Sequence, residues 1–195
     1  MSVGPNVVVI AGPNGSGKTT AAPALLRDYI GLSEFVNADV IATGLSGFDA
    51  QAMAFRAGRI MLGRLRELAA AQAEFAFETT LASRTFAPWL RTLRHYAGYR
   101  VHLLFLHLAS PEVAIARVAM RVAQGGHHVA DEVVRRRYDR GLRNFFGVYM
   151  PVVDEWMMFD NSGNRGYELI ASQVEPGEPT VADAAAWRSI RERYA

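Results

Sequence analysis

Short runs of apolar residues alternate along the chain with longer segments in which apolar residues recur every three or four positions. The short runs are rich in Val, Phe, Leu and Ile, and most are too continuous for strands that are half exposed. The longer segments have the spacing of amphipathic helices. This alternation predicts an α/β domain with parallel strands at 6–11, 34–36, 74–78, 100–108 and 156–160.

Six helices are expected to connect and flank these strands. Pro111 follows a serine and marks a good helix start, because proline fits the first turn and serine can cap it. The segment 172–183 is predicted to be a loop that runs into a C-terminal helix. The expected helices span 17–29, 51–72, 84–96, 111–124, 131–149 and 182–194.

Length and composition limit the class of protein. The 195 residues fit a single domain, and no apolar run approaches the roughly 20 residues that cross a bilayer. The absence of cysteine excludes disulfides and thiolate metal sites. The N-terminus shows no basic region or cleavage signal, so we expect a cytoplasmic protein with no membrane partner. The net charge of +2 is too small to indicate general nucleic-acid binding.

The chain contains a single lysine, Lys18, although Lys and Arg together number 21. It lies in GPNGSGKT, which fits G-x-x-x-x-G-K-[ST] between an expected strand and an expected helix. Glycines let successive N–H groups face one anion, and a lysine supplies a compact point charge where a forked guanidinium would not fit. We therefore expect Lys18 to bridge the β and γ phosphates and Thr19 to bind Mg²⁺. The expected phosphate-binding residues are Gly12, Pro13, Asn14, Gly15, Ser16, Gly17, Lys18, Thr19 and Thr20.

Other residues must select the reaction, because the same loop serves GTPase switches, motor ATPases and small kinases. The Asn-Lys-x-Asp motif that reads guanine cannot occur in a chain whose single lysine is Lys18. No expected strand ends in the Asp-Glu pair that is typical of motor ATPases. A small kinase is the leading class, and it needs a carboxylate to receive the proton of the acceptor hydroxyl.

Two carboxylates stand at the carboxyl ends of expected strands, where open α/β sheets form their ligand crevice. Asp39, in FVNADVIA, follows the second strand, and Glu78, in FAFETT, ends the third. We expect both to face the phosphates. Alternatively, Asp39 caps a helix that begins at Val40, and Glu78 is satisfied by Thr79, Thr80 or an arginine.

Seven arginines crowd around GGHHV, a segment that we interpret as a lid over the nucleotide. The apolar stripe of helix 131–149 places Arg137 and Arg135 at its edges, with Arg137 favoured. In helix 111–124, Arg121 lies closer to the buried side than Arg117. Arg136, Arg140 and Arg143 are expected to be solvated, and any single arginine can instead be an ordinary surface charge. His127 and His128 either contact phosphate or pack.

Taken together, GPNGSGKTT, FVNADVIA, FETTLASR, RVAQGGHHVADEVVRRRYDRGLRNF and FDNSG resemble the zeta-toxin family of P-loop kinases over residues 6–163. The resemblance implies a P-loop NTPase fold with a five-stranded parallel sheet of order 2-3-1-4-5 and a helical lid at about 117–140. It also implies that ATP and Mg²⁺ are used to phosphorylate a hydroxyl of a UDP-sugar such as UDP-N-acetylglucosamine. The chain follows the pattern of small, stand-alone members, whose acceptors the resemblance does not identify.

By motif position, the resemblance implies roles for individual residues. Asp39 matches the general base, and Arg121 matches an arginine that stabilises the transition state. A second arginine role falls to Arg137, Arg136 or His127. The candidate catalytic residues are Asp39, Lys18, Arg121 and Arg137; the candidate acceptor-binding residues are Asp39, Glu78, Thr79, Arg84 and His127; and Asn161, in FDNSG, is a candidate adenine contact.

Three other functions stay open. The acceptor can be another hydroxyl compound, as in the related chloramphenicol phosphotransferases. The chain can instead be a nucleotide-dependent binding module whose partner is an antitoxin protein. The third is a nucleic-acid-end kinase, which is disfavoured because no aromatic residues are interleaved in the arginine cluster.

Overall fold

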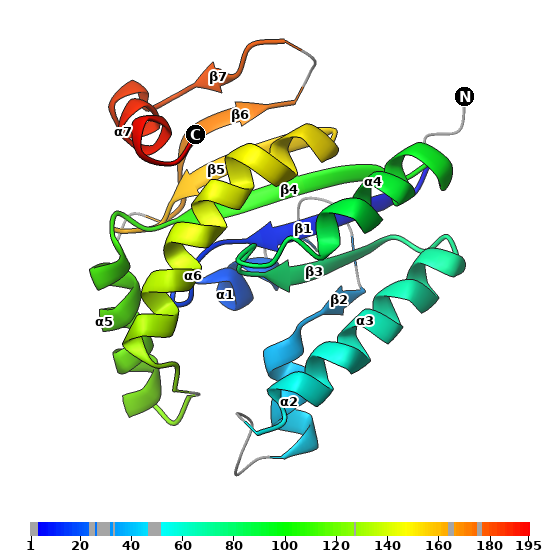
Figure 1. Cartoon of the computed structure of the whole chain (residues 1–195), viewed down its shortest axis with the longest axis horizontal. Helices are drawn as coiled ribbons and strands as arrows, with labels where there is room; N and C mark the ends of the chain where they lie inside the picture. Colours follow the sequence, from blue (N-terminus) through cyan, green and yellow to red (C-terminus); the bar gives the residue numbers. More distant parts are fainter. Residues whose placement is uncertain are drawn as a thin grey trace.

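In a computed structural model, the described residues are 4–23, 26, 32, 34–46, 52–126, 128–163, 166–174 and 177–195. Within these ranges the chain forms one seven-stranded sheet of order β2-β3-β1-β4-β5-β6-β7 (Figure 1). The five expected strands are confirmed, and so is their order. The strands are β1 (Asn6–Ala11), β2 (Phe35–Val36), β3 (Phe75–Thr79), β4 (Arg100–His107), β5 (Glu155–Asp160), β6 (Glu168–Gln173) and β7 (Thr180–Val181).

The helices follow the expected pattern with one addition. The helix between β2 and β3 is preceded by a shorter one that the apolar spacing did not predict. Most of the C-terminal part of the expected helix 17–29 lies outside the described residues. None of the described helices combines the length and apolar content that a membrane span needs. The helices are α1 (Lys18–Pro23), α2 (Ala38–Leu45), α3 (Ala54–Ala70), α4 (Phe86–Tyr96), α5 (Pro111–Ala123), α6 (Asp131–Asn144) and α7 (Ala184–Tyr194).

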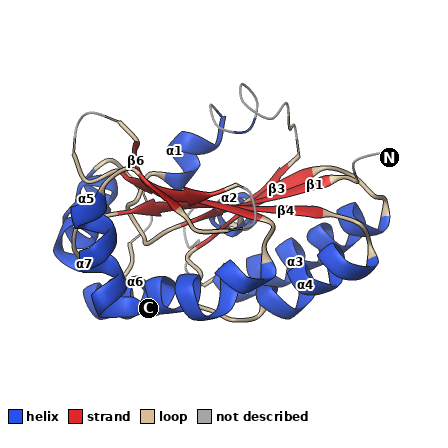
Figure 2. Ribbon diagram, turned by 90° about the horizontal axis from the view of Figure 1, so that it is seen from above, coloured by secondary structure: helices blue, strands red, loops and turns tan. Residues whose placement is uncertain are grey.

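The central strand β1 is covered on both faces. It pairs in parallel with β3 on one side and with β4 on the other. Val7 and Val9 belong to the large core on the face of α3, α4 and α6, whereas Val8 and Ile10 belong to a smaller core with α1 (Figure 2). All four side chains are fully buried, which explains the unbroken apolar run of this strand.

Two antiparallel strands correct the expected count of five. β6 pairs with β5 and β7 pairs with β6, so the predicted loop at 172–183 is wrong where these strands lie. Both residues of β7 are exposed, and in β6 only Ile170 and Ala171 are buried. β6 has only the short apolar run 169–171, which is flanked by polar residues, and β7 has a single apolar residue, and the hydrophobic pattern did not predict either strand.

The expected helix 131–149 changes its geometry after Asn144. α6 ends there, and a π-helical turn, Phe145–Tyr149, continues the chain. A π turn takes in more residues than an α turn, so it shifts the direction of every side chain that follows. Phe145 and Tyr149 remain fully buried, which is why the apolar spacing looked like one uninterrupted helix.

Candidate active site

The loop between β1 and α1 bends tightly against neighbouring backbone. Gly15 and Gly17 have φ angles of +78° and +84°, a region that side chains rarely adopt. A Cβ at Gly15 would lie 2.9 Å from the Ala114 carbonyl oxygen, and one at Gly17 would lie 2.8 Å from the Asn161 amide nitrogen. These positions therefore require glycine. Among the described residues, the buried hydroxyl of Ser16 has no hydrogen-bond partner.

Lys18 is buried at the foot of this loop. Its ammonium donates to the carbonyls of Gly12 and Pro13, both at 2.9 Å, and lies 3.6 Å from a carboxylate oxygen of Glu78. Burial lowers the pKa of Lys18, while the charges of Glu78 and Asp39 oppose that shift. An anion held by the loop would thus lie beside a cation that has already lost most of its water.

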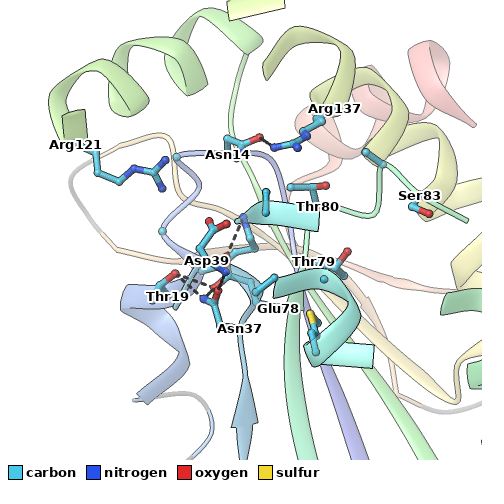
Figure 3. Close-up of a pocket in the computed structure, with 18 of the residues that line it drawn as sticks. Asn14, Thr19, Asn37, Asp39, Glu78, Thr79, Thr80, Ser83, Arg121 and Arg137 are labelled. Carbon is cyan, nitrogen blue, oxygen red and sulfur yellow. Dashed lines mark hydrogen bonds and ion pairs between the residues drawn. The ribbon is translucent and has the colours of Figure 1, made fainter. Parts of the chain in front are cut away.

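Glu78 lies at the phosphate end of the site. Its Oε2 accepts hydrogen bonds from the Thr19 hydroxyl at 2.8 Å and from the Asn37 amide at 2.7 Å (Figure 3). With Lys18 near Oε1, both carboxylate oxygens have partners in the structure. The alternative in which Thr79 or Thr80 satisfies this carboxylate finds no support here, because neither donates to it among the described contacts.

Asp39 lies in the first turn of α2 and is exposed. The cap of this helix is Asn37, whose side-chain oxygen accepts from the backbone N–H groups of Asp39 and Val40 at 2.7 and 3.3 Å. The alternative that Asp39 caps a helix beginning at Val40 is therefore wrong. Its carboxylate lines the cavity, close enough to both Lys18 and Arg137 to oppose the lowering of their pKa values by burial.

The two favoured arginines approach the loop from different helices (Figure 3). Arg137, on α6, donates to the Asn14 side chain at 3.4 Å, and burial lowers its pKa. Arg121, on α5, is partly buried and packs against Gly126, where a Cβ would collide with it. Arg135 instead pairs with Glu112 on the surface.

A cavity of about 900 Å³ brings most of the expected residues together. Arg136 and Arg140 are exposed as expected, yet they also line it. Arg84 and Asn161 do not, and His127 lies outside the described residues. Gly12, Pro13 and Ser16 are buried within the phosphate loop and do not line the cavity. The expected residues that line the cavity are Asn14, Gly15, Gly17, Lys18, Thr19, Thr20, Asp39, Glu78, Thr79, Arg121 and Arg137.

The chain after β3 forms a further wall of the cavity and is held from behind. Leu81 is fully buried with φ at +53°, a strained conformation for a leucine. Its carbonyl accepts a hydrogen bond from the Asn144 amide at 2.6 Å, and Asn144 also accepts from Arg84 at 3.2 Å. The Tyr149 hydroxyl donates to the Ser83 carbonyl at 2.6 Å. The segment 79–85 therefore depends on α6 and the π turn for its shape.

The chain after β5 closes the other side of the phosphate loop. The Asn161 amide donates to the Ser16 carbonyl at 2.9 Å, and Arg117 donates to the Ser162 carbonyl at 3.0 Å. The His107 side chain and hydrogen bonds from Ser162 lower the pKa of Asp160 to about 2. Asn161 thus supports the loop from behind and does not line the cavity.

Among the residues that sequence reasoning missed, two polar ones lie beside the phosphate loop. Asn37 joins Thr19 to Glu78, and its signal was an asparagine two residues before an aspartate at a strand end. Arg117 was set aside in favour of Arg121, although the two are four residues apart and both line the cavity.

A family model described as an AAA domain, AAA_33, matches residues 7–147. A curated relative from Haemophilus influenzae, described as an uncharacterized protein, is 28% identical over 131 residues. That match covers 67% of this chain and 91% of the relative.

Solved structures of similar fold include a bacterial toxin system and a small-molecule kinase. The AvrRxo1-ORF1:-ORF2 structure with ATP has a TM-score of 0.72 at 19% identity; the match covers 97% of this chain and only 64% of that one. The PezAT toxin-antitoxin system of Streptococcus pneumoniae gives 0.64 at 14% identity, with 99% and 87% covered. A gluconokinase from Sinorhizobium meliloti gives 0.53 at 17% identity, with 82% and 84% covered. At these identities the likeness concerns the fold.

Proposed function

The chain belongs to the AAA_33 family of AAA domains, and we propose that it is an ATP-dependent kinase that phosphorylates a hydroxyl of a small molecule. One observation carries the proposal. Asp39, which the cap of α2 does not need, lines the same cavity as Lys18 and two arginines from separate helices. A carboxylate beside a phosphate cradle is what a kinase needs to direct an alcohol at phosphorus.

Two structural neighbours support this class at the level of the fold. One contains ATP and another is a gluconokinase, a kinase of a small hydroxyl compound. The match of the family model, residues 7–147, includes the phosphate loop, Asp39, Glu78, Arg121 and Arg137.

The proposed reaction is direct transfer in one step. The loop amides and Lys18 bind the β and γ phosphates, and Asp39 receives the acceptor proton as the acceptor oxygen bonds to the γ phosphorus. The bond from that phosphorus to the bridging oxygen breaks, and ADP leaves with its electron pair. Arg121 and Arg137 face the charge that develops on the transferred group.

The residues present fit Mg²⁺, a hard cation that prefers oxygen ligands. The Thr19 hydroxyl and the Glu78 carboxylate lie 2.8 Å apart beside the loop. Among the described residues no group of three or more His, Asp or Glu side chains could hold a metal by itself, so phosphate oxygens and water would supply the other ligands, as is usual for this ion. When bound, Mg²⁺ would neutralise phosphate charge. We therefore assign Glu78 to the binding of Mg²⁺, and Asp39 and Thr79 to the binding of the acceptor.

The acceptor in this proposal is a small hydroxyl compound, and a UDP-sugar such as UDP-N-acetylglucosamine is the first one to test. The test incubates the purified protein with ATP, Mg²⁺ and a panel of UDP-sugars and cell metabolites, and looks by mass spectrometry for one added phosphoryl group. Lys18→Ala is the control. We expect the rate of transfer to fall at least about 100-fold, because the substitution removes the positive charge that binds the phosphates.

A second function, nucleotide-dependent binding of an antitoxin protein, is favoured by the likeness to the PezAT system. It predicts ATP binding without transfer. Bound ATP that yields neither ADP nor a phosphorylated product across the whole panel would reject the kinase and favour this alternative.

A further inference from the structure

Helix α3 turns one face to the cavity, and the proposed transfer gives that face no role. Phe55, Gly58, Arg59 and Leu62 line the cavity, and their spacing of three and four residues places them on one side of the helix. Phe55 is 80% exposed, which is unusual for a large aromatic side chain. This face, residues 55, 58, 59 and 62, is called the α3 wall below.

Gly58 lies in the interior of α3, where glycine is among the least favourable residues. Its φ angle is not positive, and a Cβ added there would meet no atom within 4 Å. Neither backbone conformation nor packing therefore requires glycine at this position. The space beside it belongs to the cavity, so the missing side chain leaves room for a ligand against the helix backbone.

The cavity carries far more positive than negative charge. Its described lining includes Lys18 and six arginines against two carboxylates, Asp39 and Glu78. Lys18, Arg121 and Arg137 lie around the phosphate loop, and Arg117 donates to backbone carbonyls after β5. The remaining arginines are Arg59 on α3 and Arg136 and Arg140 on α6.

The side chains of these three arginines are exposed, and no hydrogen bond or ion pair joins these side chains to another residue in the described ranges. They line the cavity, Arg59 from α3 and the other two from α6, and Figure 1 shows these two helices lying apart. Charges of one sign that gather in a cavity raise the local concentration of ligands of the opposite sign. Since the phosphates of ATP are met at the loop, the surplus favours a second anion.

We propose that the α3 wall binds the acceptor and that the acceptor is anionic, carrying a phosphate or a carboxylate that pairs with Arg59. The inference rests on the proposed kinase function, because it assigns the second substrate of that site. Because Gly58 has no side chain, the acceptor can approach the backbone of α3, and Phe55 packs against the apolar or ring portion of the acceptor. Neutral hydroxyl compounds are then poor acceptors.

The test measures binding, so that it does not depend on turnover. The protein is saturated with Mg²⁺ and a non-hydrolysable ATP analogue, and probes are titrated by calorimetry. UDP-N-acetylglucosamine and gluconate are the anionic probes, with phosphate and carboxylate chemistry respectively, and N-acetylglucosamine and glucose are their neutral counterparts. We expect at least one anionic probe to bind at least about tenfold more tightly than its counterpart.

Arg59→Gln should weaken the binding of that probe by roughly tenfold to a hundredfold, the usual effect of losing a charged hydrogen-bond partner. Arg66→Gln is the matched control, because Arg66 is exposed on the same helix and does not line the cavity. It should leave both probe and nucleotide affinity unchanged.

Substitutions at two glycines of α3 distinguish an effect on probe binding from an effect on the stability of the protein. Gly63 also lies inside α3, and a Cβ there also meets nothing within 4 Å, but it lines a separate hollow beside β2. Gly58→Ala and Gly63→Ala should each raise Tm by about 2–4 °C, since alanine favours a helix interior more than glycine does. Only Gly58→Ala should weaken the binding of the anionic probe.

Several results would overturn the inference: neutral probes that bind as tightly as anionic ones, no binding of either anionic probe, or equal effects of Arg59→Gln and Arg66→Gln. The results that would reject the proposed kinase function are different from these. Transfer to a neutral acceptor that is insensitive to Arg59→Gln keeps the kinase and rejects the anionic acceptor. Anionic probes that bind at the α3 wall without any transfer keep this site and reject the kinase.

Discussion

At the scale of residues, neighbouring polar side chains in VNAD have separate tasks. Asn37 caps α2 through its side-chain oxygen and joins Thr19 to Glu78 through its amide. Asp39, two residues on, makes no cap and lies exposed at the cavity between Lys18 and Arg137. A carboxylate that is not needed to cap the helix, yet faces a basic cavity, is the best candidate for proton transfer.

Asp39→Asn should keep ATP affinity and reduce phosphoryl transfer by roughly 100-fold or more, because the amide cannot take up the acceptor proton. Calorimetry gives the affinity, and a coupled assay for ADP gives kcat. Asp131→Asn is the matched control, an aspartate in the first turn of α6 that does not line the cavity. Turnover close to wild type in Asp39→Asn would exclude Asp39 as the base.

The sequence predicted the residues of the phosphate loop because their spacing is itself the chemical requirement. Asp39 and Glu78 were predicted because they lie at strand ends. A strand end indicates the edge of the sheet at which a side chain lies, but not the residues that it contacts. Whether Glu78 meets Thr19 or the acceptor depends on which rotamer the packing allows, and the sequence carries no signal for that. Arg117 was missed for the same reason, because its partners are carbonyls 45 residues away in sequence.

At the scale of elements, α6 links the two halves of the site. Its middle carries Arg137, which reaches the phosphate loop at Asn14, and its end carries Asn144, which holds Leu81. Five residues of α-helix turn by about 500°, so Asn144 and Tyr149 would otherwise point well apart. The π turn between them lets both reach the segment after β3. Nothing in the apolar spacing indicated this turn.

Asn144→Leu should destabilise the protein by about 1–3 kcal/mol and raise the KM of the acceptor more than that of ATP. The leucine is similar in size but cannot donate to the buried Leu81 carbonyl, which is left without its partner. Urea unfolding measures the first effect, and initial rates at varied acceptor and ATP measure the second. An equal rise in both KM values would mean that Asn144 supports the fold and has no particular effect on the acceptor side.

At the scale of the whole molecule, the parallel part of the sheet was predictable and its extension was not. Continuous apolar runs identified β1 to β5 because both faces of these strands are buried. β6, β7 and α7 lie beyond residue 147, where the match to the family model ends. β6 joins the rest through its antiparallel pairing with β5, and α7 packs there through Trp187, which stacks on Trp156 with ring centres 5.4 Å apart and planes at 16°.

These contacts lie away from the cavity, since neither tryptophan lines it. Trp187→Ala should therefore lower stability by about 3–5 kcal/mol, or Tm by roughly 6–20 °C, without changing ATP affinity at 25 °C. Trp187→Phe keeps an aromatic ring and should recover part of the loss. Calorimetric scans and ATP titrations on the same samples test both statements. A fall in ATP affinity at temperatures where Trp187→Ala is fully folded would show that the C-terminal extension affects the nucleotide site. A change in packing at β6 would then alter the position of β1 through the strands that lie between them.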